Sequence, residues 1–127
     1  MTVMIVENSG VMQRVWRDML DRIDGLILIG IYSGAPAAIA SLSHVTPDIV
    51  LLDIQLDEGC GIDVLRVLAA RQSDAKVIVV TSDTDAVYRR YYTHAGAYAF
   101  YGKEEFDAIH HTLASLANPG LANAALG

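Results

Sequence analysis

The sequence has a single cysteine, three prolines and few charged residues, which occupy only 19% of its 127 positions. Because Cys60 has no cysteine partner in the chain, the protein is not a small secreted scaffold built on internal disulfides. A hydrophobic fraction of 53% excludes a disordered tail. The 9 basic residues are outnumbered by 15 acids, and the net charge of −6 argues against nucleic-acid binding. The length suits one globular domain.

The longest segment without an acidic or basic residue covers positions 25–47, which is long enough for a membrane span. Turn-forming residues interrupt it at Ser33-Gly34 and again at Pro36. Two soluble elements joined by a turn are therefore predicted in place of one membrane helix. The first basic residue is Arg14, and Glu7 interrupts the apolar start, unlike a signal peptide. We expect a cytoplasmic protein with no membrane contact.

Short apolar runs alternate with segments of helical periodicity along nearly the whole chain. Strands are predicted at residues 3–6, 26–31, 49–52, 77–80 and 98–101. Helices are predicted at residues 12–23 after an N-cap at Ser9, and at 37–45, 62–70, 85–95 and 104–116. This alternation predicts an α/β fold, a doubly wound five-stranded parallel sheet covered by helices on both faces.

Polar side chains follow four of the predicted strands. They are Glu7 and Asn8 after the first, Asp53 after the third, Thr81 and Ser82 after the fourth, and Lys103 after the fifth. Ligands of such sheets bind beyond the carboxyl ends of the strands. Oxygen ligands suit Mg²⁺, and a hydroxyl with an ammonium group suits phosphoryl oxygens. The alternative is that each residue only marks where the chain leaves the core.

Four segments, in this order, resemble the receiver domain of two-component response regulators. They are VMIVEN at 3–8, PDIVLLD at 47–53, VVTS at 79–82 and AGAYAFYGK at 95–103. The resemblance spans about residues 2–117. It implies a flavodoxin-like sheet with strand order 2-1-3-4-5 and five flanking helices. It also implies a receiver domain over residues 1–117, followed at 118–127 by a short tail or the start of a linker, without an output domain.

The same resemblance implies a role for each polar residue. Asp53 is expected to accept a phosphoryl group from a sensor histidine kinase or a histidine phosphotransfer protein. Mg²⁺ is expected at Glu7, Asn8, Asp53 and the backbone carbonyl of Gln55. The phosphoryl group is expected to contact Thr81 and Lys103, and Phe100 is expected to rotate on activation. Gly61 corresponds to the glycine that closes the loop after the acceptor.

Three positions depart from the pattern of the family. Asn8 stands where a second carboxylate is most common, so the metal site loses one negative charge. Asp57 and Glu104 each replace a common proline. These departures put metal affinity and loop rigidity in question more than phosphorylation itself.

The predicted helix at 85–95 carries an unusual concentration of tyrosine and arginine. We expect Tyr88, Arg90 and Tyr91 to contact a partner, because tyrosine and arginine are enriched in interfaces. The alternative is a mixed face with half-buried tyrosines. In the family, the fourth helix, fifth strand and fifth helix form a common contact surface. This surface implies a downstream protein partner, an output domain or a homodimer.

The predicted function is a phosphorylation-controlled signalling switch, and not an enzyme beyond the loss of its own phosphate. One alternative is a degenerate receiver that binds partners without phosphorylation, which Asn8 motivates. Another is a phosphatase of the haloacid dehalogenase type. That class needs a second aspartate two residues after the nucleophile, where this chain has Gln55.

Overall fold

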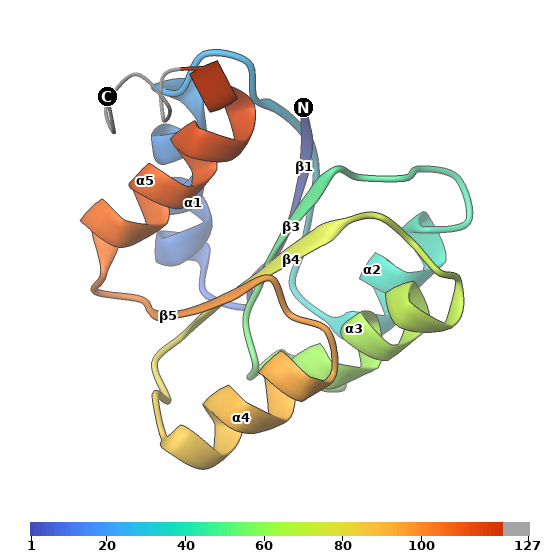
Figure 1. The fold of residues 1–127 in the computed structure, drawn as a ribbon. Coiled ribbons are helices and arrows are strands. Elements are labelled where there is room, and N and C mark those ends of the chain that lie inside the picture. The colour runs from blue at the N-terminus through green and yellow to red at the C-terminus, as the bar shows by residue number, and fades with distance from the viewer. Residues whose placement is uncertain (121–127) are drawn as a thin grey trace.

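The computed structural model describes residues 1–120 and contains a five-stranded parallel sheet in the order β2-β1-β3-β4-β5 (Figure 1). In chain order, the elements are β1 (Thr2–Val6), α1 (Gly10–Asp21), β2 (Ile27–Tyr32), α2 (Ala35–Ser41), β3 (Ile49–Leu52), α3 (Gly61–Ala70), β4 (Lys76–Thr81), α4 (Ala86–His94), β5 (Ala99–Gly102) and α5 (Phe106–Ala117). All strand pairs are parallel. The predicted fold class and strand order are confirmed.

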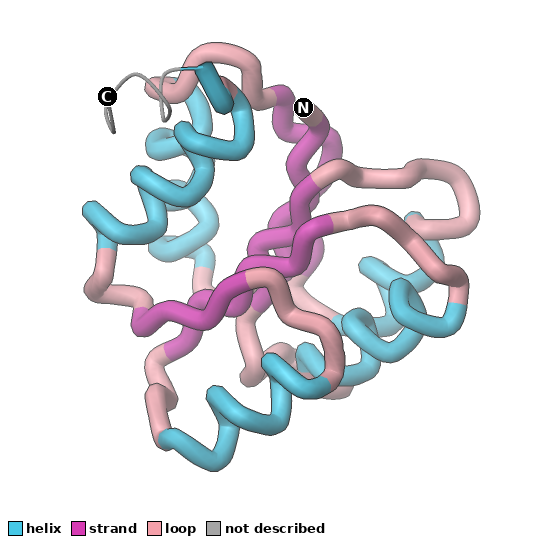
Figure 2. The backbone as a smooth tube through the Cα atoms, in the orientation of Figure 1, coloured by secondary structure: helices cyan, strands magenta, loops and turns pink. Residues whose placement is uncertain are grey.

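Helices cover both faces of the sheet, as Figure 2 shows, with α1 and α5 on one side and α2, α3 and α4 on the other. Successive side chains of a strand point to opposite faces, so β1 contributes to two cores. Val3 and Ile5 pack in the core beneath α1 and α5, whereas Met4 and Val6 pack in the core beneath the other three helices. Burial on both faces explains why the central strands are continuous apolar runs.

The carboxyl ends of the strands meet at one edge of the sheet, because all strands run in the same direction. The register of β1 and β3 aligns Val6 with Leu52. Just beyond this pair, the Asp53 N–H donates to the Val6 carbonyl over 2.9 Å. At the end of β4, the Thr81 carbonyl accepts the Lys103 N–H over 2.9 Å. The polar residues that follow these strands are thereby fixed by the backbone itself.

Two predicted helix boundaries were wrong for local reasons. The α2 helix ends at Ser41 and not at residue 45, and the Ser41 hydroxyl donates to the Ala38 carbonyl over 2.7 Å. Such a side-chain bond competes with continuation of the helix. The α5 helix begins at Phe106 and not at residue 104, because the Glu105 carboxylate accepts the Gly102 N–H over 2.6 Å in a preceding turn. The remaining boundaries differ from the predicted ones by two residues or fewer.

Other local predictions are confirmed. The Ser9 side chain caps α1 by accepting the Met12 N–H over 3.3 Å. Gly96 follows α4 with a φ of +111°, a conformation that favours glycine. The uncharged segment 25–47 forms β2 and α2, and among residues 1–120 no helix has the length and apolarity needed to cross a bilayer. Of the predicted tail, residues 121–127 lie outside the described part of the chain.

Candidate functional site

The residues that follow β1, β3 and β5 form a buried ionic cluster at the carboxyl edge of the sheet. The Lys103 ammonium lies 2.9 Å from Asp53 Oδ2 and 3.0 Å from Glu7 Oε1. Glu7 is completely buried and Asp53 is 2% exposed. A buried carboxylate is stable only when it is paired and hydrogen-bonded. One ammonium shared by two carboxylates leaves the cluster with a formal charge of −1.

Glu7 is held by three residues besides its own strand. Its Oε2 accepts the Ser9 N–H over 3.0 Å and lies 3.1 Å from Lys103 Nζ. Its Oε1 accepts the indole N–H of Trp16 over 3.2 Å. These donors come from the loop after β1, from α1 and from the loop after β5. Glu7 is thus fixed in orientation from three directions.

Asp53 lies between Lys103 and the loop that follows β3. Its Oδ1 accepts the Gln55 N–H over 3.3 Å. Burial raises the pKa of Asp53 from 3.8 to about 6; the hydrogen bond from Lys103 opposes this rise and the neighbouring Glu7 adds to it. Burial lowers the pKa of Lys103, but its hydrogen bonds to Asp53 and Glu7 outweigh that effect and the net shift is upward. The ammonium is therefore charged at neutral pH.

The raised pKa of Asp53 predicts a pH-dependent stability in the absence of metal. Between about pH 4 and 6 the folded protein binds more protons than the unfolded chain, so the free energy of unfolding falls as the pH rises. We expect a decrease on the order of 2 kcal/mol across this window, measured by urea unfolding. The Asp53→Asn variant should lack this component. Parallel curves for the two proteins would contradict the assignment.

Gly61 lets the start of α3 approach the backbone at the end of β3. A Cβ atom at this position would collide with the backbone carbonyl of Asp53. The Gly61 N–H donates to the Ile54 carbonyl over 3.0 Å, which closes the loop after Asp53. The loop predicted from the resemblance is therefore present, and glycine is required here by close approach to the backbone.

Thr81 ends β4, where its carbonyl accepts the Lys103 N–H, and Phe100 lies on the neighbouring strand β5. Thr81 is 1% exposed, and its hydroxyl accepts the Asp83 N–H over 3.0 Å. Phe100 is 5% exposed, and its ring centroid lies 6.3 Å from that of Tyr92. The Arg89 guanidinium stacks 4.9 Å from the Phe100 ring and donates to the Phe100 carbonyl over 3.0 Å. Phe100 thus occupies an inward position held by α4.

Asn8 and Gln55 carry oxygen atoms of the type that a hard cation binds. Asn8 and Gln55 are exposed at the rim, next to the buried carboxylates in sequence. No group of three or more His, Cys, Asp or Glu side chains in residues 1–120 is arranged to hold a metal ion. The amide of Asn8 in place of a carboxylate is consistent with this result. The donor set therefore suits Mg²⁺ in type but is poor in charge.

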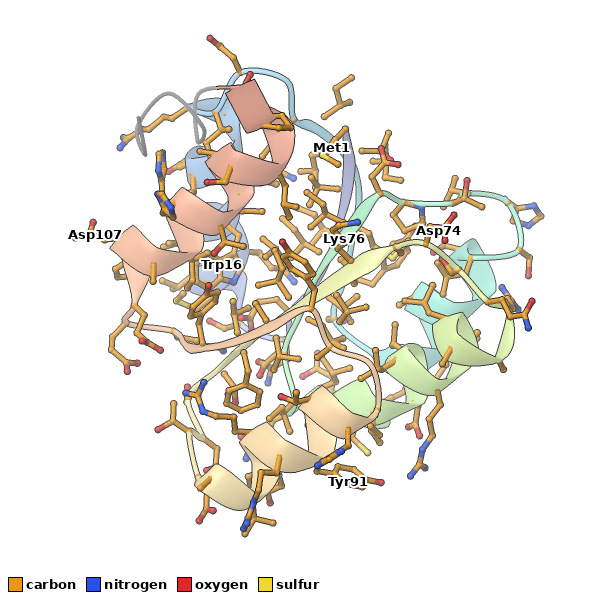
Figure 3. All side chains as sticks on the ribbon, viewed as in Figure 1. Met1, Trp16, Asp74, Lys76, Tyr91 and Asp107 are labelled. Atoms are coloured by element: carbon orange, nitrogen blue, oxygen red, sulfur yellow. The ribbon has the colours of Figure 1, made fainter. Side chains whose placement is uncertain are left out.

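The three predicted partner residues lie on α4. Tyr88 is 40% and Tyr91 46% exposed, and Arg90 is also exposed. The Tyr91 hydroxyl accepts a hydrogen bond from Arg66 of α3, whose guanidinium lies 5.9 Å from the Tyr91 ring. Tyr88 and Tyr91 line a hollow together with Ile54, Leu56, Cys60 and Ile62. These tyrosines therefore lie toward α3, where Figure 3 labels Tyr91.

Two contacts were missed by the sequence interpretation. Trp16 lies within the helix predicted at residues 12–23, whose periodicity gave no sign that its indole N–H binds Glu7. Arg89 lies in the predicted helix at 85–95 next to the residues expected to contact a partner, yet it stacks on Phe100. The one available signal for Trp16 is its polar N–H, which a buried indole must pair.

The chain is similar in sequence and fold to known proteins. Residues 3–114 match the family model of the response regulator receiver domain. The DNA-binding transcriptional activator EvgA of Escherichia coli is 30% identical over 105 residues, which cover 83% of this chain and 51% of that protein. A protein-glutamate methylesterase/protein-glutamine glutaminase of Myxococcus xanthus is 30% identical over 80 residues, or 63% of this chain and 23% of that protein. The chain spans about half the length, or less, of these curated relatives.

Solved structures agree on the fold. A DNA-binding response regulator of the LuxR family from Staphylococcus aureus superposes with a TM-score of 0.83 at 19% identity, covering 92% of this chain and 98% of that one. The response regulator domain of CheB from Thermotoga maritima gives a TM-score of 0.79 at 20% identity, covering 94% of both chains. The sequence match over residues 3–114 shows that the chain belongs to the family of response regulator receiver domains of two-component systems.

Proposed function

We propose that this domain is a signalling switch that accepts a phosphoryl group on Asp53 from a phosphohistidine of a sensor kinase or a phosphotransfer protein. The observation that carries the proposal is the position of Lys103, whose ammonium lies 2.9 Å from Asp53 Oδ2. A carboxylate attacks a phosphoryl group only when the added negative charge is neutralised. Family membership supports the same role.

In this transfer the Asp53 carboxylate attacks phosphorus, and a phosphorus–oxygen bond forms as the phosphorus–nitrogen bond of the donor breaks. Lys103 stabilises the incoming phosphoryl oxygens. Thr81, at the end of β4, donates a hydrogen bond from its hydroxyl to one of them. Asp53, Asn8 and the Gln55 carbonyl would hold Mg²⁺; Glu7, which the resemblance also implies as a ligand, already contacts Lys103 through both carboxylate oxygens. The bound cation would neutralise phosphoryl charge during transfer.

Incubation with acetyl phosphate and Mg²⁺, followed by intact-mass measurement, tests the proposal. A gain of one phosphate that persists after removal of the donor supports the switch. Donor turnover without accumulation of phosphoprotein would instead indicate a phosphatase. Absence of any reaction would indicate a degenerate receiver that binds partners in its unphosphorylated form.

Asn8→Asp is expected to tighten Mg²⁺ binding. A hard cation is bound more strongly as the charge of its oxygen ligands increases, and one added carboxylate in a partly solvated site should raise the affinity about tenfold. Calorimetric titration with Mg²⁺ measures this effect. Asn118→Asp, which adds the same charge at the end of α5, is the matched control. An unchanged affinity in Asn8→Asp would show that residue 8 is not a ligand.

Thr81→Ala is expected to permit phosphorylation but to disconnect it from α4 and β5. The hydroxyl that would follow the phosphoryl group is lost, so Phe100 keeps the inward position held by Arg89. NMR shifts of Phe100 and Tyr91 on addition of beryllofluoride with Mg²⁺ measure the response. Thr84→Ala, at an exposed position, is the control. Equal shifts in Thr81→Ala and wild type would refute the coupling.

We further propose that the α4 surface containing Tyr88, Arg90 and Tyr91 contacts the downstream partner or output domain. Receiver domains act on such partners, and the exposed aromatic and arginine side chains support this surface. The curated relatives are longer than this chain, so the kind of output that this surface contacts is part of the proposal. The test compares Arg90→Glu with the control Arg14→Glu on α1. A pull-down measures how much partner each variant retains.

A further inference from the structure

Protein donors contact both oxygens of the Glu7 carboxylate. A carboxylate offers about four lone-pair sites. At Oε1 these sites face the Trp16 indole N–H at 3.2 Å and Lys103 Nζ at 3.0 Å. At Oε2 they face the Ser9 N–H at 3.0 Å and Lys103 Nζ at 3.1 Å. Since Glu7 is completely buried, protein donors supply every polar contact that its carboxylate needs.

Trp16 also contacts the segment that carries Lys103. The indole ring is completely buried between α1, α5 and the sheet (Figure 3), and its centroid lies 6.0 Å from that of Phe106. Phe106 is the first residue of α5, three positions after Lys103. The intervening turn is closed by the Glu105 N–H, which donates to the Gly102 carbonyl over 3.1 Å. One side chain of α1 therefore contacts both the counter-ion of Lys103 and the residue that follows this turn.

We propose that Trp16 is a positioning residue for phosphoryl transfer: its indole N–H fixes Glu7 as a counter-ion, so that the Lys103 ammonium stays shared between Glu7 and Asp53. Glu7 then pairs with Lys103 and does not bind Mg²⁺ directly. This inference rests on the proposed role of Asp53 and Lys103. It assigns to a buried core residue of α1 a function that its apolar environment does not reveal.

Trp16→Phe removes the N–H donor and keeps an aromatic ring. Glu7 Oε1 then loses a neutral donor, so the carboxylate attracts Lys103 more strongly and gains a lone pair able to face a cation. Phosphorylation by acetyl phosphate at saturating Mg²⁺ is expected to slow about tenfold or more, the factor for one hydrogen bond to a charged group. The affinity for Mg²⁺ alone is expected to stay the same or to rise.

Trp16 is the only tryptophan in the chain, so its indole N–H gives a single NMR resonance. Replacing Glu7 with Gln removes the charge from the acceptor and is expected to move this resonance toward the position of a weaker hydrogen bond. Leu20→Ala, a buried position farther along α1, is the control and should leave the resonance in place. This measurement does not require the Trp16→Phe variant to fold.

A double-mutant cycle separates a role through Glu7 from loss of packing. In the Glu7→Gln background, Trp16→Phe is expected to change the phosphorylation rate by less than about twofold. An equal rate loss in both backgrounds, or a parallel loss of rate and Mg²⁺ affinity like that of Leu20→Ala, would overturn the proposal. If the wild type takes no phosphate, the function proposed for Asp53 fails. The indole resonance then tests the inference by itself. If this resonance does not move in Glu7→Gln, the proposed bond between Trp16 and Glu7 is wrong.

Discussion

Asp53→Asn is expected to abolish phosphorylation of the domain, with labelling by acetyl phosphate falling at least about a hundredfold, because an amide in place of the attacking carboxylate removes the nucleophile. The substitution is nearly isosteric at a position that is 2% exposed, so the fold should be retained. Lys103 keeps Glu7 as a partner at 3.0 Å. Intact-mass measurement after incubation with acetyl phosphate and Mg²⁺ gives the extent of labelling.

The matched control for this loss is Asp57→Asn, in the exposed part of the same loop. Asp57 has its backbone N–H bonded to the Ser33 carbonyl over 3.1 Å, and its carboxylate lies outside the ionic cluster. We expect this variant to be labelled like the wild type. Persistent labelling of Asp53→Asn, together with loss of labelling in Asp57→Asn, would show that Asp57 and not Asp53 accepts the phosphoryl group.

Lys103→Met is expected to have the largest effect on stability. It leaves the buried carboxylates of Glu7 and Asp53 without their shared cation, and breaking a buried ion pair in this way costs about 3 kcal/mol. The pKa of Asp53 should rise further, since Lys103 now opposes the effect of burial. A raised pKa favours the protonated folded state, so the loss of stability should be greatest near pH 8 and smallest near pH 5.

Urea unfolding of Lys103→Met and wild type at pH 5 and pH 8 measures this difference. The chain contains two lysines, and Lys76→Met is the control. Lys76 lies at the start of β4, 5.8 Å from the Tyr98 ring centroid, where its loss should cost less than about 1 kcal/mol and show little pH dependence. An equal loss for Lys103→Met at both pH values would mean that the carboxylates do not depend on this cation.

The sequence by itself determined the fold class and the location of the site. Apolar runs such as 49–52 have no polar alternation, which identifies strands buried on both faces before any contact is known. Once the strands are parallel, every residue that follows one of them reaches the same edge. Glu7, Asp53 and Lys103 could therefore be placed together from their positions in the chain, and the structure brings them within hydrogen-bonding distance.

The tertiary structure alone decided how that cluster is held and which groups control it. The bonds from Trp16 to Glu7 and from Arg89 to the Phe100 carbonyl join different elements. Their formation depends on helix orientation and rotamer choice, which periodicity leaves open. A tryptophan on an apolar helical face is expected to be buried in either case, whether or not its N–H binds a carboxylate. That choice is made by the packing of α1 and α5 against one end of the sheet, because only in the assembled core does Glu7 lose water as a hydrogen-bond partner.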